Sequence, residues 1–255
     1  MIALLSPAKR LKEMDRLKAS SEGTQPLFLE QAKEIMRDHV RKDVAQLIRL
    51  HKVSEDIARL NRTRNEEWLS RDGQGKVRAA DLFDGEVYRG LATDRWSQED
   101  WQYAQNKVFI LSGLYGLLRP MDLVLPYRLE MGSRMSVGQH KDLYSFWSGA
   151  LPQTIFDLSE NRPIIDLSSA EYIKAADLGK ISELLHKVDF LEDKKDGRPP
   201  RSIQVHLKKA RGYLAHYMVR ARVSNLAELR SFNTSGYSFD SDRSSATNTV
   251  FLRTI

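Results

Sequence analysis

The chain has 255 residues, of which 40 are Lys or Arg and 34 are Asp or Glu, and it contains no cysteine. The absence of cysteine excludes disulfides and a thiol switch, and no apolar run approaches the roughly 18 residues of a membrane helix. Residues 1–5 are too short for the core of a signal peptide, so we expect a cytoplasmic protein with no membrane partner.

The first predicted element is a buried strand over residues 2–5, which leads into Ser6-Pro7-Ala8-Lys9. Ser6 and Lys9 have the S-x-x-K spacing of some acyl enzymes, but those enzymes need the tetrad on a helix together with S-D-N and K-T-G motifs. Neither partner motif occurs in this sequence, and the tetrad follows a strand, so the spacing indicates coincidence. Lys9 remains a candidate anion contact at the end of that strand.

Two helices should follow a charged loop over residues 10–26. The first is predicted from about 27 to 51, and Ser54 is a suitable N-cap for the second. Ile57, Leu60 and Trp68 are expected to bury the apolar face of this second helix.

The junction between these two helices is similar to a helix-hairpin-helix, which binds the DNA backbone through an L-x-G-h-G-x-x-h-A pattern. Residues 50–58 keep the apolar positions, but Lys52 and Ser54 replace the two glycines that let backbone N–H groups approach a phosphate. Two interpretations stay open: a DNA-binding hairpin in which lysine supplies the charge, or a plain packing unit. The DNA-binding candidates here are Arg49, Lys52, Ser54, Arg59 and Arg62.

Further elements follow from apolar runs, caps and turns. Residues 83–91 predict a strand and a turn, Ser97 with Asp100 predicts a capped helix to about residue 106, and residues 141–158 predict another helix. A buried strand is expected over 163–167. Strands over 187–192 and 202–207 flank Asp196-Gly197 and predict a hairpin, followed by a helix over 208–222 and a strand over 249–253.

Residues 108–132 combine a buried strand, a turn at Ser112-Gly113 and two proline breaks. If residues 127–131 are extended, Tyr127, Leu129 and Met131 point to one face while Arg128 and Glu130 point to the other. A charged face beside the core is typical of a binding or catalytic site, and also of an ordinary edge strand. The elements together predict a single domain over residues 1–255, of mixed α/β class, with a central mixed sheet surrounded by helices.

The positive charge is concentrated in two windows. Residues 41–64 carry seven basic and three acidic residues, and residues 200–230 carry seven basic residues and one acidic residue. Localised positive charge indicates an anionic partner, most often nucleic acid, although solvated helix faces also explain it. In the second window the DNA-binding candidates are Lys208, Lys209 and Arg211.

Charged residues also follow several predicted strands and helix ends. Because strand ends of an α/β sheet converge on one crevice, they predict a cleft that binds phosphate and stacks a base on tyrosine. Glu130 and Glu171 are its candidates for acid/base catalysis. The alternative is a buried ion-pair network that only shapes the core. The other cleft candidates are Lys9, Arg119, Arg128, Asp166, Lys174, Lys209, Arg211 and Tyr237.

The six histidines include no H-E-x-x-H or H-x-H pattern, and no G-x-G-x-x-G or Walker loop occurs. We therefore expect no metal site and no cofactor.

Several blocks, in order from residue 6 to about residue 253, resemble the YaaA peroxide-stress protein family. They are SPAK at 6–9, FDG at 83–85, LSGLYGLLRPMDLVLPYRLEMG at 111–132, DLYSFW at 142–147, LSSAEY at 167–172, KKARG at 208–212 and FNTSGY at 232–237.

The resemblance implies a mixed α/β fold with a helix-hairpin-helix, DNA binding, resistance to hydrogen peroxide and a lowering of available intracellular iron. It implies no settled reaction and no cofactor. We therefore expect a peroxide-stress protein that binds duplex or distorted DNA through its basic surfaces. The alternative is an enzyme that acts on nucleic acid or nucleotides, for example by base excision at Glu130 and Glu171.

Overall fold

The fold is built on a seven-stranded sheet in the order β10-β11-β9-β8-β1-β5-β6. The structure, a computed structural model, describes residues 1–14, 17, 22–70, 75–176, 179 and 181–255. Strands β1, β5, β8, β9 and β11 run parallel, whereas β6 and β10 are antiparallel edge strands. The sheet strands are β1 (Ile2–Leu5), β5 (Val108–Ser112), β6 (Gly116–Leu118), β8 (Ile164–Leu167), β9 (Leu185–Asp193), β10 (Ser238–Asp240) and β11 (Asn248–Thr254).

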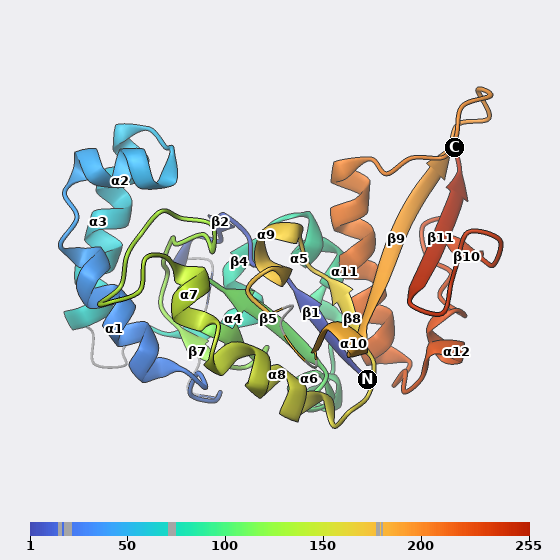
Figure 1. The fold of residues 1–255 in the computed structure, drawn as a ribbon, viewed down its shortest axis with the longest axis horizontal. Coiled ribbons are helices and arrows are strands. Elements are labelled where there is room, and N and C mark those ends of the chain that lie inside the picture. Colours follow the sequence, from blue (N-terminus) through green and yellow to red (C-terminus); the bar gives the residue numbers. More distant parts are fainter. Residues whose placement is uncertain (15–16, 18–21, 71–74, 177–178, 180) are drawn as a thin grey trace.

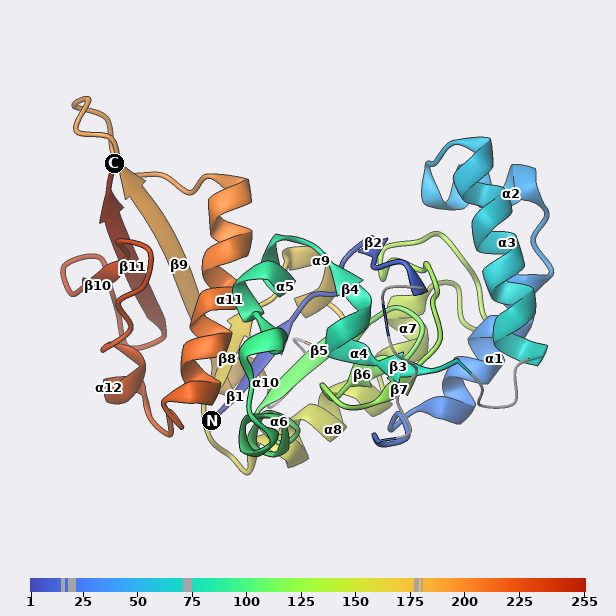
Figure 2. The same ribbon diagram turned by 180° about the vertical axis from the view of Figure 1, so that it is seen from behind.

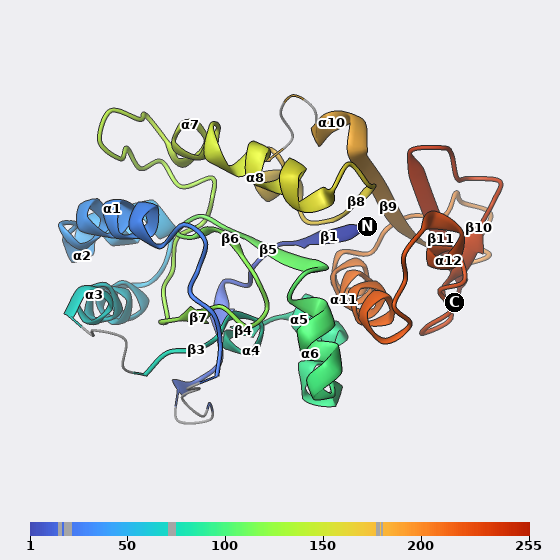
Figure 3. The same cartoon turned by 90° about the horizontal axis from the view of Figure 1, so that it is seen from below.

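Helices lie on both faces of this sheet, with α7, α8 and α10 on one side and α5, α6 and α11 on the other (Figure 3). The helices are α1 (Leu29–Val40), α2 (Val44–His51), α3 (Glu55–Ser70), α4 (Ala79–Leu82), α5 (Glu86–Leu91), the 3₁₀ helix η2 (Thr93–Arg95), α6 (Gln98–Ala104), α7 (Leu143–Trp147), α8 (Ala150–Ser159), α9 (Ala170–Ile173), α10 (Ile181–Leu184), α11 (Gln204–Arg220) and α12 (Leu226–Leu229). Two short pairs complete the chain, β2 (Arg10–Leu11) with β4 (Phe83–Asp84) and β3 (Val77–Arg78) with β7 (Leu123–Val124). The mixed α/β prediction is confirmed.

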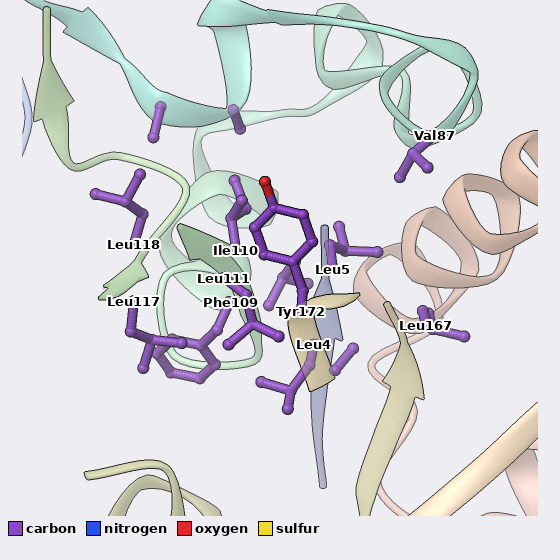
Figure 4. Packing of buried hydrophobic residues seen from close by; sticks show 14 of the residues in the cluster. Leu4, Leu5, Val87, Phe109, Ile110, Leu111, Leu117, Leu118, Leu167 and Tyr172 are labelled. Atoms are coloured by element: carbon purple, nitrogen blue, oxygen red, sulfur yellow. The ribbon is translucent and has the colours of Figure 1, made fainter. Parts of the chain in front are cut away.

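The centre of the sheet is apolar on both sides because helices cover both faces. Every residue of β1 and β5 is buried, and Ala3 lies opposite Val108 while Leu5 lies opposite Ile110. Figure 4 shows Leu4 and Leu5 packed among β5 side chains, with Tyr172 in the same cluster. These strands therefore form a rigid base whose carboxyl ends can position other residues.

Helices α5 and α11 cross closely on the back of the sheet (Figure 2). Gly90 and Gly212 meet at the crossing, where a Cβ on Gly212 would collide with the Val87 carbonyl oxygen and the Gly90 backbone. The two helices can approach this closely only because both positions lack a side chain.

The hairpin region differs from prediction in two ways. The single helix predicted over 27–51 is wrong: α1 ends at Val40 and α2 starts at Val44, because Asp43 caps α2 in a capping box with Gln46. The predicted burial of Ile57 and Leu60 is also wrong, since they are 41% and 48% exposed. The buried face of α3 consists of Ala58, Asn61, Asn65 and Trp68, of which only Trp68 was predicted.

Several other boundaries needed correction. The helix predicted over 141–158 is two helices, α7 and α8, and residues 86–91 form α5 instead of a turn. Residues 202–207 do not form the second strand of a hairpin, because α11 begins at Gln204. Strand β9 pairs with β11 instead. The Glu192–Arg201 bridge is the part of the predicted hairpin pairing that the structure contains. Residues 127–131 alternate in burial as predicted, but they belong to none of the strands in the described part of the chain.

Candidate functional site: a charged cleft beside a helical hairpin

A cleft of about 590 Å³ opens where β1 and β8 end. The segments that follow these strands form part of its wall, and Asp84, the start of α5 and the first two turns of α11 form the rest. Its charged lining consists of Lys9, Arg10, Lys208, Arg211, Asp84, Glu86 and Glu171. Carboxyl ends of parallel strands and helix N-termini commonly meet at ligand sites in α/β sheets, and this cleft has that arrangement.

Hydrogen bonds between the strand ends fix the floor of the cleft. The backbone N–H of Ser169 donates to Ser6 Oγ at 2.9 Å, and Ser6 Oγ lies 3.3 Å from Ser169 Oγ. The Tyr88 hydroxyl donates to the Ser6 carbonyl at 3.0 Å. Burial raises the pKa of Tyr88, so this hydroxyl stays protonated and holds the loop after β1 in place.

Helix α11 provides the basic wall. Lys208 is exposed, whereas Arg211 is half-buried, and its Nε is buried without a hydrogen-bond partner among the described residues. Burial lowers the pKa of Arg211, while the charges of Asp166 and Asp189 raise it. Ile203 gives no side-chain cap to α11, which leaves first-turn N–H groups available to an anion.

A recess next to the cleft is formed around Glu130, and Lys9 lines both spaces. Glu130 Oε1 lies 2.9 Å from an Arg128 guanidinium nitrogen and 3.9 Å from Lys9 Nζ. Its other oxygen, Oε2, accepts a hydrogen bond from His51 Nδ1 at 3.1 Å. Burial alone would raise the pKa of Glu130, but the His51 hydrogen bond and the Arg128 charge together lower it to about 2. Glu130 is therefore an ionised acceptor.

His51 also contacts His39, at an Nε2–Nε2 distance of 3.1 Å. His39 is fully buried near the end of α1, and the His51 side chain is fully buried at the end of α2. Burial and the neighbouring His51 lower the pKa of His39 to about 3, so His39 is neutral.

The hairpin turn joins α2 to α3. Lys52 occupies the left-handed conformation with φ 52° and ψ 53°, a conformation that favours glycine. Arg49, Lys52 and Ser54 are exposed. Arg59 and Arg62 are exposed too, but each forms an ion pair four residues away along α3, with Glu55 and Glu66.

Glu171 lines the cleft as expected, and its Oε1 accepts a hydrogen bond from the Gly132 backbone N–H at 2.9 Å. Lys174 lies 4.7 Å from the centre of the Tyr144 ring, and the Tyr144 hydroxyl donates to the Glu171 carbonyl. The 129–132 loop and α9 are thus tied together at the cleft.

Of the expected cleft residues, Lys9, Glu171 and Arg211 line the cleft, and Arg128 and Glu130 line the adjoining recess. The others do not line either space: Arg119, Asp166, Lys174, Lys209 and Tyr237. Arg119 pairs with the fully buried Asp122 at 3.1 Å and donates to the Gln25 carbonyl. Tyr237 is buried near the C-terminus, where its hydroxyl donates to Glu192 Oε1 at 3.0 Å. Lys209 turns towards the Tyr213 ring, unlike Lys208 beside it. Sequence order could not place these side chains, because their direction depends on packing.

His39 and His51, which lie at the centre of the contact with Glu130, were not among the residues predicted for the site. His39 continues the buried set Ala32, Ile35 and Met36 at helical spacing, and His51 follows Leu47 by one turn. A histidine at a buried position of an apolar helix face needs a polar partner, and that signal was present in the sequence.

No group of three or more His, Asp or Glu is placed to hold a metal ion within the described part of the chain. None of the described helices is long and apolar enough to cross a membrane.

A family model described as peroxide stress protein YaaA matches residues 1–243. The chain is 36% identical over 258 residues to a UPF0246 protein of Legionella pneumophila strain Philadelphia 1, covering 99% of each chain. It is 38% identical over 259 residues to UPF0246 proteins of Burkholderia mallei and Burkholderia pseudomallei, covering 99% of this chain and 98% of theirs.

Proposed function

We propose, from the premise that the chain belongs to the YaaA peroxide stress protein family, that it binds DNA through its charged cleft and its hairpin. The observation that carries the proposal is the position of these two basic features on one edge of the molecule. In Figure 1 the α2–α3 hairpin and the first turn of α11 stand on either side of the carboxyl ends of β1 and β8.

The chemistry of this edge suits a phosphate backbone. Lys9, Arg10 and Lys208 bring positive charge to the cleft, and Arg49 and Lys52 bring it to the hairpin turn. Cations that replace the counterions of DNA give an affinity that is independent of sequence and falls steeply with salt. Lys52 already has the backbone conformation that a hairpin glycine would adopt, which supports the hairpin as a phosphate contact.

Duplex, bubble and abasic DNA, each incubated with the protein and run on native and denaturing gels, test this proposal. Shifted but intact strands, and an affinity that drops by at least tenfold between about 50 and 200 mM salt, are expected. An affinity that does not change with salt would contradict binding through basic surfaces.

A second candidate is an enzyme that acts on nucleic acid or nucleotides in the same cleft. Glu171 favours it, because this carboxylate lines the cleft together with Lys208 and Arg211. A carboxylate between phosphate-binding cations can serve as a general acid or base. Cleaved strands or a released base on the denaturing gel would support this candidate, provided that Glu171→Gln abolishes the product.

The biological setting is a proposal of the same kind. The protein acts in the cytoplasm during peroxide stress and is linked to the limitation of free iron. Chelatable iron, measured after a peroxide challenge in cells with and without the protein, tests that link. The same measurement in cells that carry the Lys52→Glu, Lys208→Glu double variant shows whether the effect on chelatable iron depends on the basic surfaces.

A further inference from the structure

We propose that the cleft holds one nucleotide with a terminal phosphate, either free or at the end of a DNA strand. The phosphate lies between Ser169 and the α11 residues Lys208 and Arg211, and the nucleoside lies against the apolar lining. This proposal rests on the proposed function and names the part of the DNA that enters the cleft.

The size of the cleft limits what can enter it. Its volume of about 590 Å³ is within the range of small-molecule sites, roughly 300–1,000 Å³. A sphere of that volume is about 10 Å across, whereas the major groove of a duplex alone is about 12 Å wide. A duplex can therefore lie across the mouth of the cleft, but only a unit the size of one nucleotide can occupy it.

The charge of the lining favours a single phosphate. Four cations and three carboxylates line the cleft, which is an excess of one positive charge. A phosphate monoester carries about 1.5 to 2 negative charges at pH 7 and offsets that excess. A strand that continued through the cleft would bring a second phosphate, and the lining has no positive charge left to balance it.

Lys208 and Arg211 are the cations available to that phosphate. The other two are already paired with carboxylates, at 2.5 Å for Arg10 and 3.9 Å for Lys9. Lys208, in contrast, has no ion pair with any residue that the structure describes. Arg211 Nε is buried and lacks a hydrogen-bond partner within the same residues. Lys208 and Arg211 are three positions apart on α11 and therefore neighbours on its surface, so both can contact one oxyanion.

Ser169 provides a hydroxyl donor on the wall that follows β8. It is the N-cap residue of α9, but its side chain makes no cap hydrogen bond. Its Oγ accepts instead from the Ser6 hydroxyl at 3.3 Å, and Ser6 Oγ accepts from the Ser169 backbone N–H at 2.9 Å. The Ser169 hydroxyl hydrogen then has no acceptor in the described part of the chain, and it can be donated to a phosphate oxygen.

The apolar part of the lining can accept the nucleoside. Two aromatic residues, Tyr88 and Tyr172, belong to it. Val205, at the start of α11, also lines the cleft and is 58% exposed, so a sugar or base that packs on it removes apolar surface from water. The remaining apolar lining residues are Pro7, Ala8, Val87 and Leu167.

Calorimetric titration of the full chain at constant ionic strength tests the assignment, with thymidine 5′-monophosphate, thymidine 3′-monophosphate, thymidine and inorganic phosphate as ligands. At least one monophosphate should bind roughly tenfold or more tightly than thymidine or phosphate, because only a nucleotide contacts both parts of the lining. Lys208→Ala and Ser169→Ala should each weaken that binding by about tenfold, the usual loss when a hydrogen bond to a charged group is removed. Lys209→Ala is the matched control, because its side chain turns towards the Tyr213 ring.

Duplexes with and without terminal phosphates, added as competitors of the bound monophosphate, distinguish the two sources of the nucleotide. Competition that requires the terminal phosphate shows that a strand end enters the cleft. If neither duplex competes, the ligand is the free nucleotide.

The inference is wrong if thymidine or inorganic phosphate binds as tightly as the monophosphates, or if neither variant weakens their binding. DNA binding without monophosphate binding overturns the inference and leaves the proposed function intact. Monophosphate binding without DNA binding has the opposite meaning: the cleft is assigned correctly and DNA is the wrong partner. Lys208 is exposed, so Lys208→Ala should fold, and the wild-type titrations decide the question even if Ser169→Ala does not.

Discussion

His51 and Glu130 are 79 positions apart in the chain, yet His51 Nδ1 lies 3.1 Å from Glu130 Oε2. The contact fixes the end of α2 against the loop that also carries Arg128. Because the same carboxylate contacts Arg128 and lies near Lys9, the hairpin and the cleft share one buried charge. An interaction at either end can therefore change the other.

Reversing the charge of the hairpin turn should weaken DNA binding. Arg49→Glu together with Lys52→Glu is expected to lower the affinity by tenfold or more, because two exposed cations of the proposed phosphate contact become anions that repel the DNA backbone. Both side chains are exposed, so the melting temperature should change little. Fluorescence anisotropy at fixed salt measures the effect.

Arg95→Glu with Lys107→Glu controls for net charge, since Arg95 lies in η2 and Lys107 directly precedes β5, away from the hairpin. If both double variants bind equally weakly, only net charge matters. If neither loses affinity, the hairpin is a packing unit.

Adjacent lysines on α11 should behave differently. Lys208 lines the cleft, whereas Lys209 lies 5.8 Å from the centre of the Tyr213 ring. Phosphate should raise the melting temperature of the wild type and of Lys209→Ala, and it should raise that of Lys208→Ala less. Differential scanning fluorimetry over a phosphate series measures these shifts, with sulfate-free chloride salt at equal ionic strength as the reference. Equal shifts in all three proteins would place the anion outside the cleft.

Glu130→Gln should destabilise the protein in a pH-dependent way. The pKa of Glu130 lies near 2 in the folded state, below its ordinary 4.5, so its ionised form stabilises the fold above about pH 4.5. This contribution is lost as the pH falls through 2. At pH 7 the variant should lose roughly 2–3 kcal/mol of unfolding free energy, and the difference from wild type should shrink below pH 4.5.

Urea unfolding at several pH values measures that difference. Glu66→Gln is the control, because Glu66 pairs with Arg62 on the exposed face of α3 and should contribute less than about 1 kcal/mol. A loss from Glu130→Gln that is the same at pH 3 and pH 7 would contradict a role for the ionised carboxylate.

Gly212→Ala should destabilise the protein and weaken anion binding in the cleft, because it separates two helices that line the cleft. The new methyl group has no room against Val87 and Gly90, so α5 and α11 must separate, at a cost of about 1–3 kcal/mol. Both helices line the cleft, and the phosphate-induced rise in melting temperature should fall with the stability. Gly149→Ala is the control, since its Cβ would meet no atom within 4 Å. Equal stability of the two variants would show that the crossing is loose.

The sequence by itself determined the local elements and the fold class. Apolar runs identified β1, β5 and β8, because strands buried on both faces need uninterrupted apolar side chains. The capping box of Ser97 and Asp100 marked the start of α6, since cap hydrogen bonds involve only neighbouring residues. The resemblance of ordered blocks over the whole chain also identified the family, which the family model confirmed.

Only the tertiary structure decided which of the charged residues meet. The sequence predicted that Glu130 and Tyr127 point to opposite faces of their segment. It could not identify the partners of Glu130, because Lys9 and His51 come from distant parts of the chain. Arg119 and Tyr237 were expected in the cleft, and packing directs them to Asp122 and Glu192. The periodicity of apolar residues predicts whether a side chain faces inward. The residue that it contacts there depends on how the strands and helices pack together.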